Sequence, residues 1–322
     1  MKTKGYVEEQ AAGKALYRGA FSPANITGEM FYNPFDFNFK NIANTGVVEW
    51  NNELLALWES DLPHALDPKT LETKGTTRMD NTIDKDGAAS AHYKIKDNRL
   101  INFGWGLSGV NDMNLKIWEY ASESYDVVQF SELTVKDAAF AFIHDFTVSD
   151  NYYGFYLNPC DLDLQKLALE YIPGKTSIAQ CIKMNENKAG RWMLIPRNGK
   201  TEDTKFFEMK GSDQFIFHHA NIYEDGDKVY VDSICLEGGV DFEVTAATVT
   251  KEYLKAREYG GTGSWTGLFR HELDLKSGEV TRYRLSDRGC EFPSINPDYV
   301  GKKYQYTYAS ASPNEGCWYQ PF

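Results

Sequence analysis

The residues best suited to chemistry are histidines in apolar, strand-forming surroundings. The chain has six histidines, and three positions stand out: His92 in SAHYKI, His144 in FIHDF, and His218 or His219 in FHHAN. Burying an imidazole without a partner costs roughly 2–7 kcal/mol, so each of these rings needs a hydrogen bond or a metal. One such histidine alone usually bonds to the backbone or to a carboxylate. Three on separate strands of a closed sheet can instead converge on one metal ion.

The ligand set indicates which metal to expect. Imidazoles without carboxylate ligands are unusual for hydrolytic zinc or magnesium, and they suit iron or copper better. Two acids could orient the rings: Glu59 in ALWES and Glu291 in CEFPSIN, each a lone charge among apolar residues. An ion pair at a strand end accounts for them equally well, and spacing does not decide. His64 and His271 stand beside turn or charged residues, and we expect both on the surface.

Other kinds of catalytic site find little support. The sequence has no G-x-S-x-G elbow and no cysteine beside a plausible base. Residues 261–267, GTGSWTG, miss the dinucleotide pattern G-x-G-x-x-G by one position. They also lead from a helical stretch into a strand, whereas a dinucleotide fingerprint follows a strand and opens a helix. We therefore expect a loop there.

The elements that must position these histidines are mostly β-hairpins, because strand-like runs joined by tight polar turns recur along the chain. Clear examples are VVEW-NN-ELLALWE (47–59), HYKI-KDN-RLINFGW (92–105), ANIYE-DGD-KVYVD (220–232) and FRHELDL-KSG-EVTRYRL (269–285). They predict an all-β fold, and 322 residues are too many for a simple small barrel. A β-propeller is the economical interpretation, while the lack of a fixed period leaves a double sandwich open.

Two segments are predicted to be helical. The first is DLDLQKLALEYI (161–172), whose apolar face at helical spacing comprises Leu164, Leu167, Ala168 and Tyr171. The second is TVTKEYLKAREYG (248–260), which ends at the glycines expected of a helix stop. No linker rich in Pro, Gly or Ser divides the chain, so we expect a single domain over residues 1–322.

The composition excludes several function classes. A formal net charge of -12 without clustered Lys and Arg opposes binding to nucleic acid. Five widely spaced cysteines without a C-x-x-C pair suggest neither a disulfide framework nor a zinc knuckle, and a reducing compartment fits best. No apolar run reaches the roughly 18 residues of a membrane span, so the chain as given is expected to be soluble.

Six stretches closely resemble the carotenoid cleavage oxygenases, the family that includes the retinal pigment epithelium isomerase. They are KNIANTGVVEWNNELLALWESDLPHALDPKTLETKG (40–75), AHYKI (91–95), FIHDFTVSDNYYGFYLNP (142–159), RWMLIPRNG (191–199), FIFHHANIYEDGDKVYVD (215–232) and CEFPSINPDYVGKKYQYTYA (290–309). The likeness runs in order from about Tyr17 to the end of the chain.

The resemblance implies a seven-bladed β-propeller with short helices and loops on one face. A ferrous ion, Fe(2+), lies on its axis, held by four histidines, three of which bond to glutamates. Carried over by motif, the ligands are His92 of S-A-H, where Tyr93 replaces the usual proline, and His144 of H-D-F. The family pattern F-H-x-x-N-A-aromatic-acid selects His218 over His219. Two of the three orienting glutamates match Glu59 and Glu291.

The resemblance also implies that the chain is truncated at both ends. After GCWYQPF the family continues with an E-P-x-F motif and an F-H-G motif, which carry the third glutamate and the fourth histidine. Family members also have a substantial segment before the stretch matched at Tyr17. We therefore expect an incomplete propeller whose last strands are missing and whose unpaired edges are exposed.

Two functions of different classes follow. The first is an iron-dependent dioxygenase that cleaves a C=C bond of a carotenoid or apocarotenoid with O2, in the cytoplasm or a plastid. The alternative is an inactive propeller remnant that binds at most an apolar ligand or a partner chain. Polyenes reside in membranes, so the apolar face of residues 161–172 is a candidate for peripheral membrane contact. Packing of that helix on the propeller is the favoured interpretation.

Overall fold

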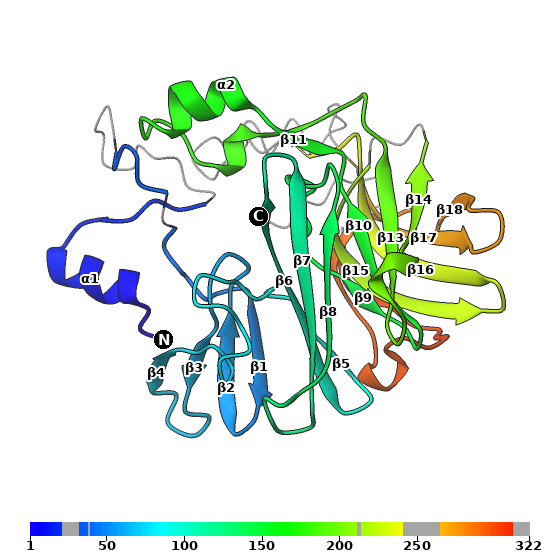
Figure 1. Ribbon diagram of the computed structural model, residues 1–322, viewed down its shortest axis with the longest axis horizontal. Coiled ribbons are helices and arrows are strands. Elements are labelled where there is room, and N and C mark those ends of the chain that lie inside the picture. Colours follow the sequence, from blue (N-terminus) through cyan, green and yellow to red (C-terminus); the bar gives the residue numbers. More distant parts are fainter. Residues whose placement is uncertain (21–31, 38, 211–213, 241–264, 312–322) are drawn as a thin grey trace. The chain divides into compact units, whose positions relative to one another are not determined.

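The computed structural model describes residues 1–20, 32–37, 39–210, 214–240 and 265–311 (Figure 1). These residues form two compact units, and each is described by itself. Of the described residues, unit 1 contains 1–140 and 162–183, and unit 2 contains 141–161, 184–240 and 265–311. Both units consist mainly of four-stranded antiparallel sheets, which confirms the predicted all-β fold. The count of seven blades and the single domain stay predictions.

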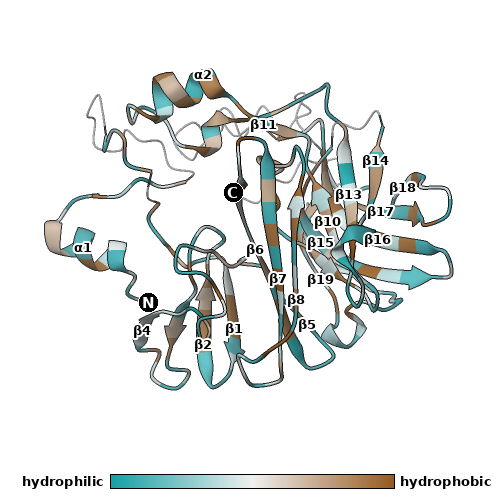
Figure 2. Ribbon diagram, viewed as in Figure 1, coloured by the Kyte–Doolittle hydropathy of each residue, from teal (hydrophilic) through white to brown (hydrophobic). Residues whose placement is uncertain are grey.

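Unit 1 contains two four-stranded sheets. One comprises β1 (Gly46–Trp50), β2 (Glu53–Leu57), β3 (His64–Leu66) and β4 (Thr73–Thr76), and the other comprises β5 (Lys94–Lys96), β6 (Arg99–Ser108), β7 (Asp112–Tyr120) and β8 (Val127–Val135). Hydrophobic and hydrophilic bands alternate along β7 in Figure 2. Met113, Leu115 and Ile117 are accordingly buried, because successive side chains of a strand point to opposite faces of its sheet.

Two hairpins of unit 1 turn on residues with a left-handed backbone. Asn51 and Asn52, between β1 and β2, have φ of 50° and 56°, and Asp97 and Asn98, between β5 and β6, have φ of 53° and 56°. A two-residue turn with positive φ at both positions matches the twist of the flanking strands, and Asn and Asp tolerate this conformation best among residues with a side chain. Both predicted hairpins are therefore confirmed, and their polar turn residues are the ones that adopt the left-handed backbone.

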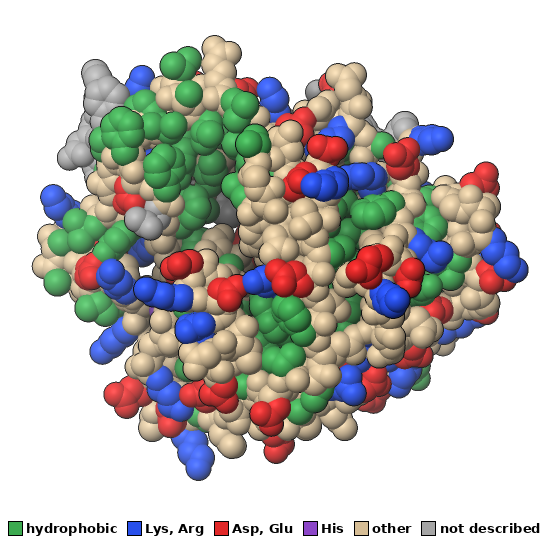
Figure 3. Space-filling model, viewed as in Figure 1, with side chains coloured by type: hydrophobic (Ala, Val, Ile, Leu, Met, Phe, Trp, Pro, Cys, Tyr) green, Lys and Arg blue, Asp and Glu red, His purple; other side chains and the backbone are tan. Residues whose placement is uncertain are grey.

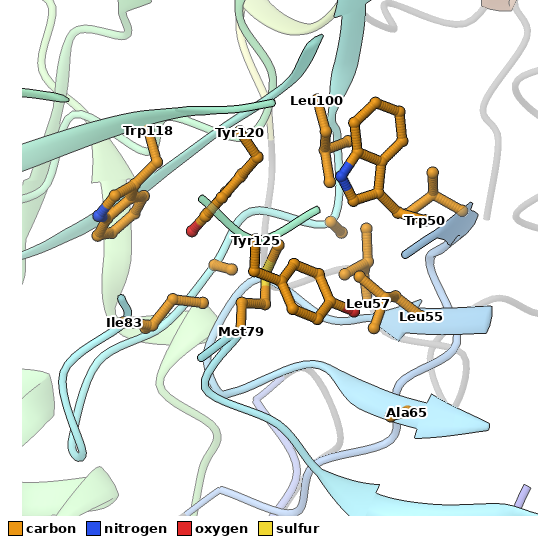
Figure 4. Close-up of a cluster of buried hydrophobic side chains, with 13 residues drawn as sticks. Trp50, Leu55, Leu57, Ala65, Met79, Ile83, Leu100, Trp118, Tyr120 and Tyr125 are labelled. Carbon is orange, nitrogen blue, oxygen red and sulfur yellow. The ribbon is translucent and has the colours of Figure 1, made fainter. Parts of the chain in front are cut away.

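Both sheets of unit 1 contribute to one buried cluster, shown in Figure 4. Leu55 and Leu57 come from β2, and Leu100 and Tyr120 come from β6 and β7. The rings of Tyr120 and Tyr125 meet edge to face with their centroids 6.3 Å apart, the arrangement that aromatic pairs prefer. This core holds the two sheets of unit 1 against each other.

The predicted helix near residues 161–172 is confirmed in part. Unit 1 has α1 (Lys4–Ala12) and α2 (Leu164–Lys166), which continues as a π-helical turn over Leu167–Tyr171, and a 3-10 turn at Ala179–Cys181. The Asp163 side chain caps α2 by accepting the Lys166 N–H at 3.0 Å. Tyr171 is buried as predicted, but Leu164 is 66% exposed, so the predicted apolar face does not pack inward as a whole. The second predicted helix, residues 248–260, lies outside the described residues.

Unit 2 contains two four-stranded sheets and a hairpin. The first sheet has the order β14 (Lys205–Met209), β13 (Gly190–Pro196), β10 (Tyr152–Leu157), β9 (Thr147–Val148), and the second comprises β15 (Phe215–Asp225), β16 (Lys228–Glu237), β17 (Trp265–Asp274) and β18 (Val280–Arg284). The hairpin is β19 (Cys290–Ser294) with β20 (Tyr308–Ala311), and 3-10 turns lie at Thr201–Asp203 and Pro297–Tyr299. The predicted hairpins β15–β16 and β17–β18 are confirmed.

Two short strands lie outside the four-stranded sheets. The strands β11 (Cys160–Leu162) and β12 (Ile182–Met184) lie where the chain passes between the units. The predicted loop over residues 261–267 is wrong at its end, because β17 already begins at Trp265, and the rest of that stretch lies outside the described residues. The cysteines in the described part of the chain are free and buried, namely Cys160, Cys181, Cys235 and Cys290.

Strand β6 offers a matched pair of glycines for a stability test. A Cβ on Gly104 would lie 2.1 Å from the carbonyl oxygen of Ala88, whereas one on Gly106 would meet nothing within 4 Å. Since backbone cannot move aside cheaply, Gly104→Ala should lower the free energy of unfolding by roughly 1–3 kcal/mol. Gly106→Ala should instead leave it unchanged or raise it by up to about 1 kcal/mol. Urea unfolding of both variants measures this, and equal stabilities would contradict the packing at Gly104.

Candidate metal centre

Unit 2 brings together two of the predicted ligands, His144 and His218. His144 lies in the irregular segment before β9, and His218 lies on β15. Their ring centroids are 5.0 Å apart, and a ring nitrogen of one lies within 4.8 Å of a ring nitrogen of the other. Both side chains are partly buried. Two neutral imidazole nitrogens at this separation can bind one transition-metal ion.

Two β-bulges in β15 decide which side chains face His144. Ile216 pairs with Cys235 and His219 with Ser233, so three residue steps on β15 oppose two on β16; a second extra residue lies between His219 and Asn221. Strict alternation of side chains along β15 would put Ile216 and His218 on one face. Instead Ile216 packs in the core cluster that contains Trp192, the ring that His219 also contacts. Bulges of this kind re-aim side chains next to functional sites.

Glu291, one of the two acids expected to orient a ligand ring, lies beside His218. Glu291 on β19 is fully buried, and its Oε2 accepts the Nδ1–H of His218 at 2.7 Å and the backbone N–H of Phe292 at 2.6 Å. A carboxylate oxygen accepts hydrogen bonds, so the proton of His218 is held on Nδ1. Nε2 is then the ring nitrogen that carries the lone pair, which is the usual form of a metal-binding histidine.

The other polar members of the His218 motif bind neighbouring segments. The Asn221 side chain donates to the carbonyl oxygens of Tyr299 and Lys302, both at 3.0 Å, and accepts the Gly301 N–H at 3.0 Å. Glu224 accepts the Ser149 hydroxyl at 2.6 Å and the backbone N–H of Asn151 at 3.0 Å. The motif therefore ties β15 to the chain that follows Glu291 and to the chain that follows His144.

Aromatic rings surround the histidine pair. Phe142 stacks on His144 with an interplanar angle of 15°, and Phe217 meets His144 edge to face at 5.4 Å between centroids. Phe292 lies 5.5 Å from His218 and is 53% exposed. The histidine pair thus lies among aromatic rings, and such apolar surroundings strengthen electrostatic interactions.

His219, the neighbour of His218, has a structural role. Its Nδ1 bonds to the Ser233 hydroxyl at 2.7 Å, and its ring packs 5.3 Å from Trp192 in the interior between the two sheets of unit 2. A buried imidazole satisfied by a side-chain hydrogen bond needs no metal. The two adjacent histidines therefore serve opposite sides of β15.

The prediction that His64 and His271 lie on the surface is wrong. His64 is buried on β3, where burial lowers the pKa of its imidazole. His271 is fully buried on β17, where the Gln214 amide N–H donates to its Nε2 at 3.2 Å. The period-two pattern of FRHELDL carries the missed signal, since Phe269, His271 and Leu273 alternate with charged residues and share the buried face.

The remaining predicted residues, His92 and Glu59, lie in unit 1. His92 is partly buried just before β5, and its backbone N–H donates to the Ser90 hydroxyl at 3.0 Å. Glu59 is partly buried in the turn after β2. The Ala89 N–H donates to the Asp61 carbonyl oxygen at 3.4 Å, which places the segments of Glu59 and His92 next to each other.

Comparisons with known proteins identify the family of this chain. A family model described as retinal pigment epithelial membrane protein matches residues 1–320. The chain belongs to the carotenoid cleavage oxygenase family. It is 31% identical over 320 residues to the apocarotenoid-15,15'-oxygenase of Synechocystis. This alignment covers 97% of this chain and 61% of that enzyme. It is 25% identical over 317 residues to the isoeugenol monooxygenase of Pseudomonas putida, covering 95% of this chain and 59% of that enzyme.

Solved structures of this family support the fold. A crystal structure of the cobalt-substituted Synechocystis apocarotenoid oxygenase superposes with a TM-score of 0.83 at 30% identity, covering 98% of this chain and 63% of that one. The chain thus spans less than two thirds of the length of these relatives. In the described part of the chain, no helix has the length and apolar character that crossing a membrane requires.

His271 should make folding stability depend on pH. Burial lowers the pKa of its imidazole from 6.5 to about 3. At a pH between these two values the ring is therefore neutral in the folded protein and gains a proton on unfolding. Stability should therefore fall as the pH drops below the unfolded pKa, by at most about 1.4 kcal/mol per pH unit from this group. His271→Gln should flatten the dependence measured by urea unfolding between about pH 7 and about pH 5. A slope identical to that of the parent protein would contradict this assignment.

Proposed function

We propose that this chain carries the metal centre of an iron-dependent oxygenase that cleaves a double bond of an apocarotenoid or carotenoid with molecular oxygen. The observation that carries the proposal is the pair of His144 and His218 in unit 2, with Nδ1 of His218 bonded to the buried Glu291. This donor set fits a ferrous ion, because it offers neutral nitrogen donors whose orientation is fixed by a buried carboxylate.

We propose His92 as a third ligand and Glu59 as an acid that orients a ligand ring. The S-A-H motif around His92 and the proximity of its segment to the turn of Glu59 support both roles. The family match over residues 1–320, which includes the segments of both residues, supports the assignment.

Iron bound at this site would supply the activation of molecular oxygen. The residues of the chain would perform the remaining tasks. Glu291 holds the proton of His218 on Nδ1 and so fixes the orientation of the ring. Phe142 and Phe217 shield His144 from water, and the exposed ring of Phe292 offers apolar surface next to His218. A polyene, which is apolar and polarisable, matches this surface.

The adjacent histidines allow a direct test of the iron site. The parent protein should bind close to one iron per chain and bleach an apocarotenoid in detergent when oxygen is present. His218→Ala should remove both properties, since metal sites depend on each ligand. His219→Gln is the matched control and should keep its iron, because His219 bonds to Ser233 on the other side of β15. Iron analysis of the purified variants measures the difference.

Two outcomes would refute parts of this proposal. A parent protein without iron and without oxygen-dependent bleaching would refute the oxygenase and favour a chain that only binds an apolar ligand. Loss of iron in His219→Gln but not in His218→Ala would instead exchange the roles of the two histidines.

We also propose a peripheral membrane contact at the helix α2, where hydrophobic side chains gather in Figure 3. Leu164 and Leu169 are 66% and 59% exposed, and Phe35 is 74% exposed. The Phe35 N–H donates to the Ile172 carbonyl oxygen at 2.9 Å, which holds these apolar side chains in one part of unit 1. Such a patch is unusual on a surface that faces only water, and it suits the membrane in which polyenes dissolve.

Liposome flotation tests the membrane contact. The double variant Leu164→Glu with Leu169→Glu should lose flotation with phosphatidylcholine vesicles, because each charge would have to enter the apolar layer. The matched control is Val127→Glu with Val128→Glu, which places the same charges on exposed apolar positions of β8. Flotation that survives the α2 substitutions would exclude this patch as the contact.

A further inference from the structure

Asp145 joins the two segments that carry the histidine pair. Its side chain is buried, with Oδ1 accepting the Phe146 N–H at 2.8 Å and Oδ2 accepting the His219 N–H at 2.9 Å. Asp145 directly follows His144, and His219 directly follows His218. One carboxylate therefore links the chain immediately after one histidine to the chain immediately after the other.

Asn158 makes the equivalent link on the other side of the pair. Its buried side chain donates to the carbonyl oxygens of Phe142 and Ile216, both at 3.0 Å, and accepts the Ile216 N–H at 2.8 Å. Phe142 stands two residues before His144, and Ile216 stands two residues before His218. Asn158 and Asp145 together bracket both histidines, and we call this arrangement the double clamp.

The double clamp acts where regular backbone pairing is missing. Residues 141–146 belong to no strand, and the bulges of β15 interrupt its pairing with β16 between Ile216 and Asn221. Ile216 and His219 still pair with β16, but the regular ladder of hydrogen bonds is interrupted beside both histidines. Buried side-chain bonds to the backbone can replace them, and those to a carboxylate are about twice as strong as neutral ones.

We propose that Asp145 and Asn158 are positioning residues that set the separation and angle of the His144 and His218 rings. This inference rests on the proposed metal centre. The double clamp fixes the two backbones at four points around the rings, so loosening either link lets the rings move apart. A metal ion tolerates little such movement, because a ligand misplaced by even 1 Å no longer coordinates well.

Asp145→Asn tests the link with almost no change in shape. One carboxylate oxygen becomes an NH2 group, which donates and cannot accept, so the bond from either the Phe146 N–H or the His219 N–H is lost. In the full chain, affinity for Co2+ should fall about tenfold or more, as it does when groups that orient metal ligands are changed. The visible spectrum of the Co2+ form should also shift, because this spectrum reports the geometry of the ligands. A variant that only lost stability would keep the spectrum of the parent protein.

Glu224→Gln is the matched control. Glu224 lies on β15, the strand of His218, and like Asp145 it accepts a backbone N–H from another segment, here the chain between β9 and β10. It does so six positions beyond His218, away from the pair. The same chemical change there should leave Co2+ affinity and spectrum as in the parent protein, even if it lowers the unfolding temperature.

A second variant and two distinct outcomes complete the test. Asn158→Ala should also weaken Co2+ binding. This variant replaces Asp145→Asn in the test if Asp145→Asn does not fold. The double clamp alone would be overturned if the parent protein binds Co2+ and the folded variants bind it with unchanged affinity and an unchanged spectrum. A parent protein that binds neither Co2+ nor Fe2+ would overturn the metal centre, and this inference with it.

Discussion

The hydrogen bond between Glu291 and His218 is the interaction around which unit 2 is organised. A fully buried carboxylate is costly unless its oxygen is bonded, and here Oε2 accepts both an imidazole N–H and a backbone N–H. The bond forms only if β19 lies against the bulged part of β15. Asn221 secures that packing, since its side chain binds the turn at residues 299–302 that follows β19.

The bulges of β15 weaken its pairing with β16 and also determine which side chains face His144. They remove ladder hydrogen bonds, but they turn Phe217 and His218 toward His144 while Ile216 and His219 enter the core. Regular pairing would have placed alternate residues on alternate faces and could not have put two consecutive rings beside His144. Asp145 and Asn158 offset part of the lost pairing by binding the backbone directly.

Imidazoles in unit 2 show that burial alone does not identify a metal ligand. His271 is more deeply buried than His218, yet its Nε2 is occupied by Gln214 and its surroundings keep it neutral. His219 is likewise satisfied by Ser233. His218 differs because its Nδ1 is bonded to a carboxylate and its ring lies next to the ring of His144. The partner of each ring, and not its depth, separates a structural histidine from a candidate ligand.

The sequence by itself determined the all-β class, because turn residues such as Asn51–Asn52 and Asp97–Asn98 specify hairpins through local backbone preferences. Its motifs also singled out His144, His218 and Glu291 by family resemblance. Only the tertiary structure decided the burial of His64 and His271, the faces of β15 and the exposure of Leu164. These depend on bulges and on contacts between residues far apart in the chain, such as His218 with Glu291, and no local pattern encodes them.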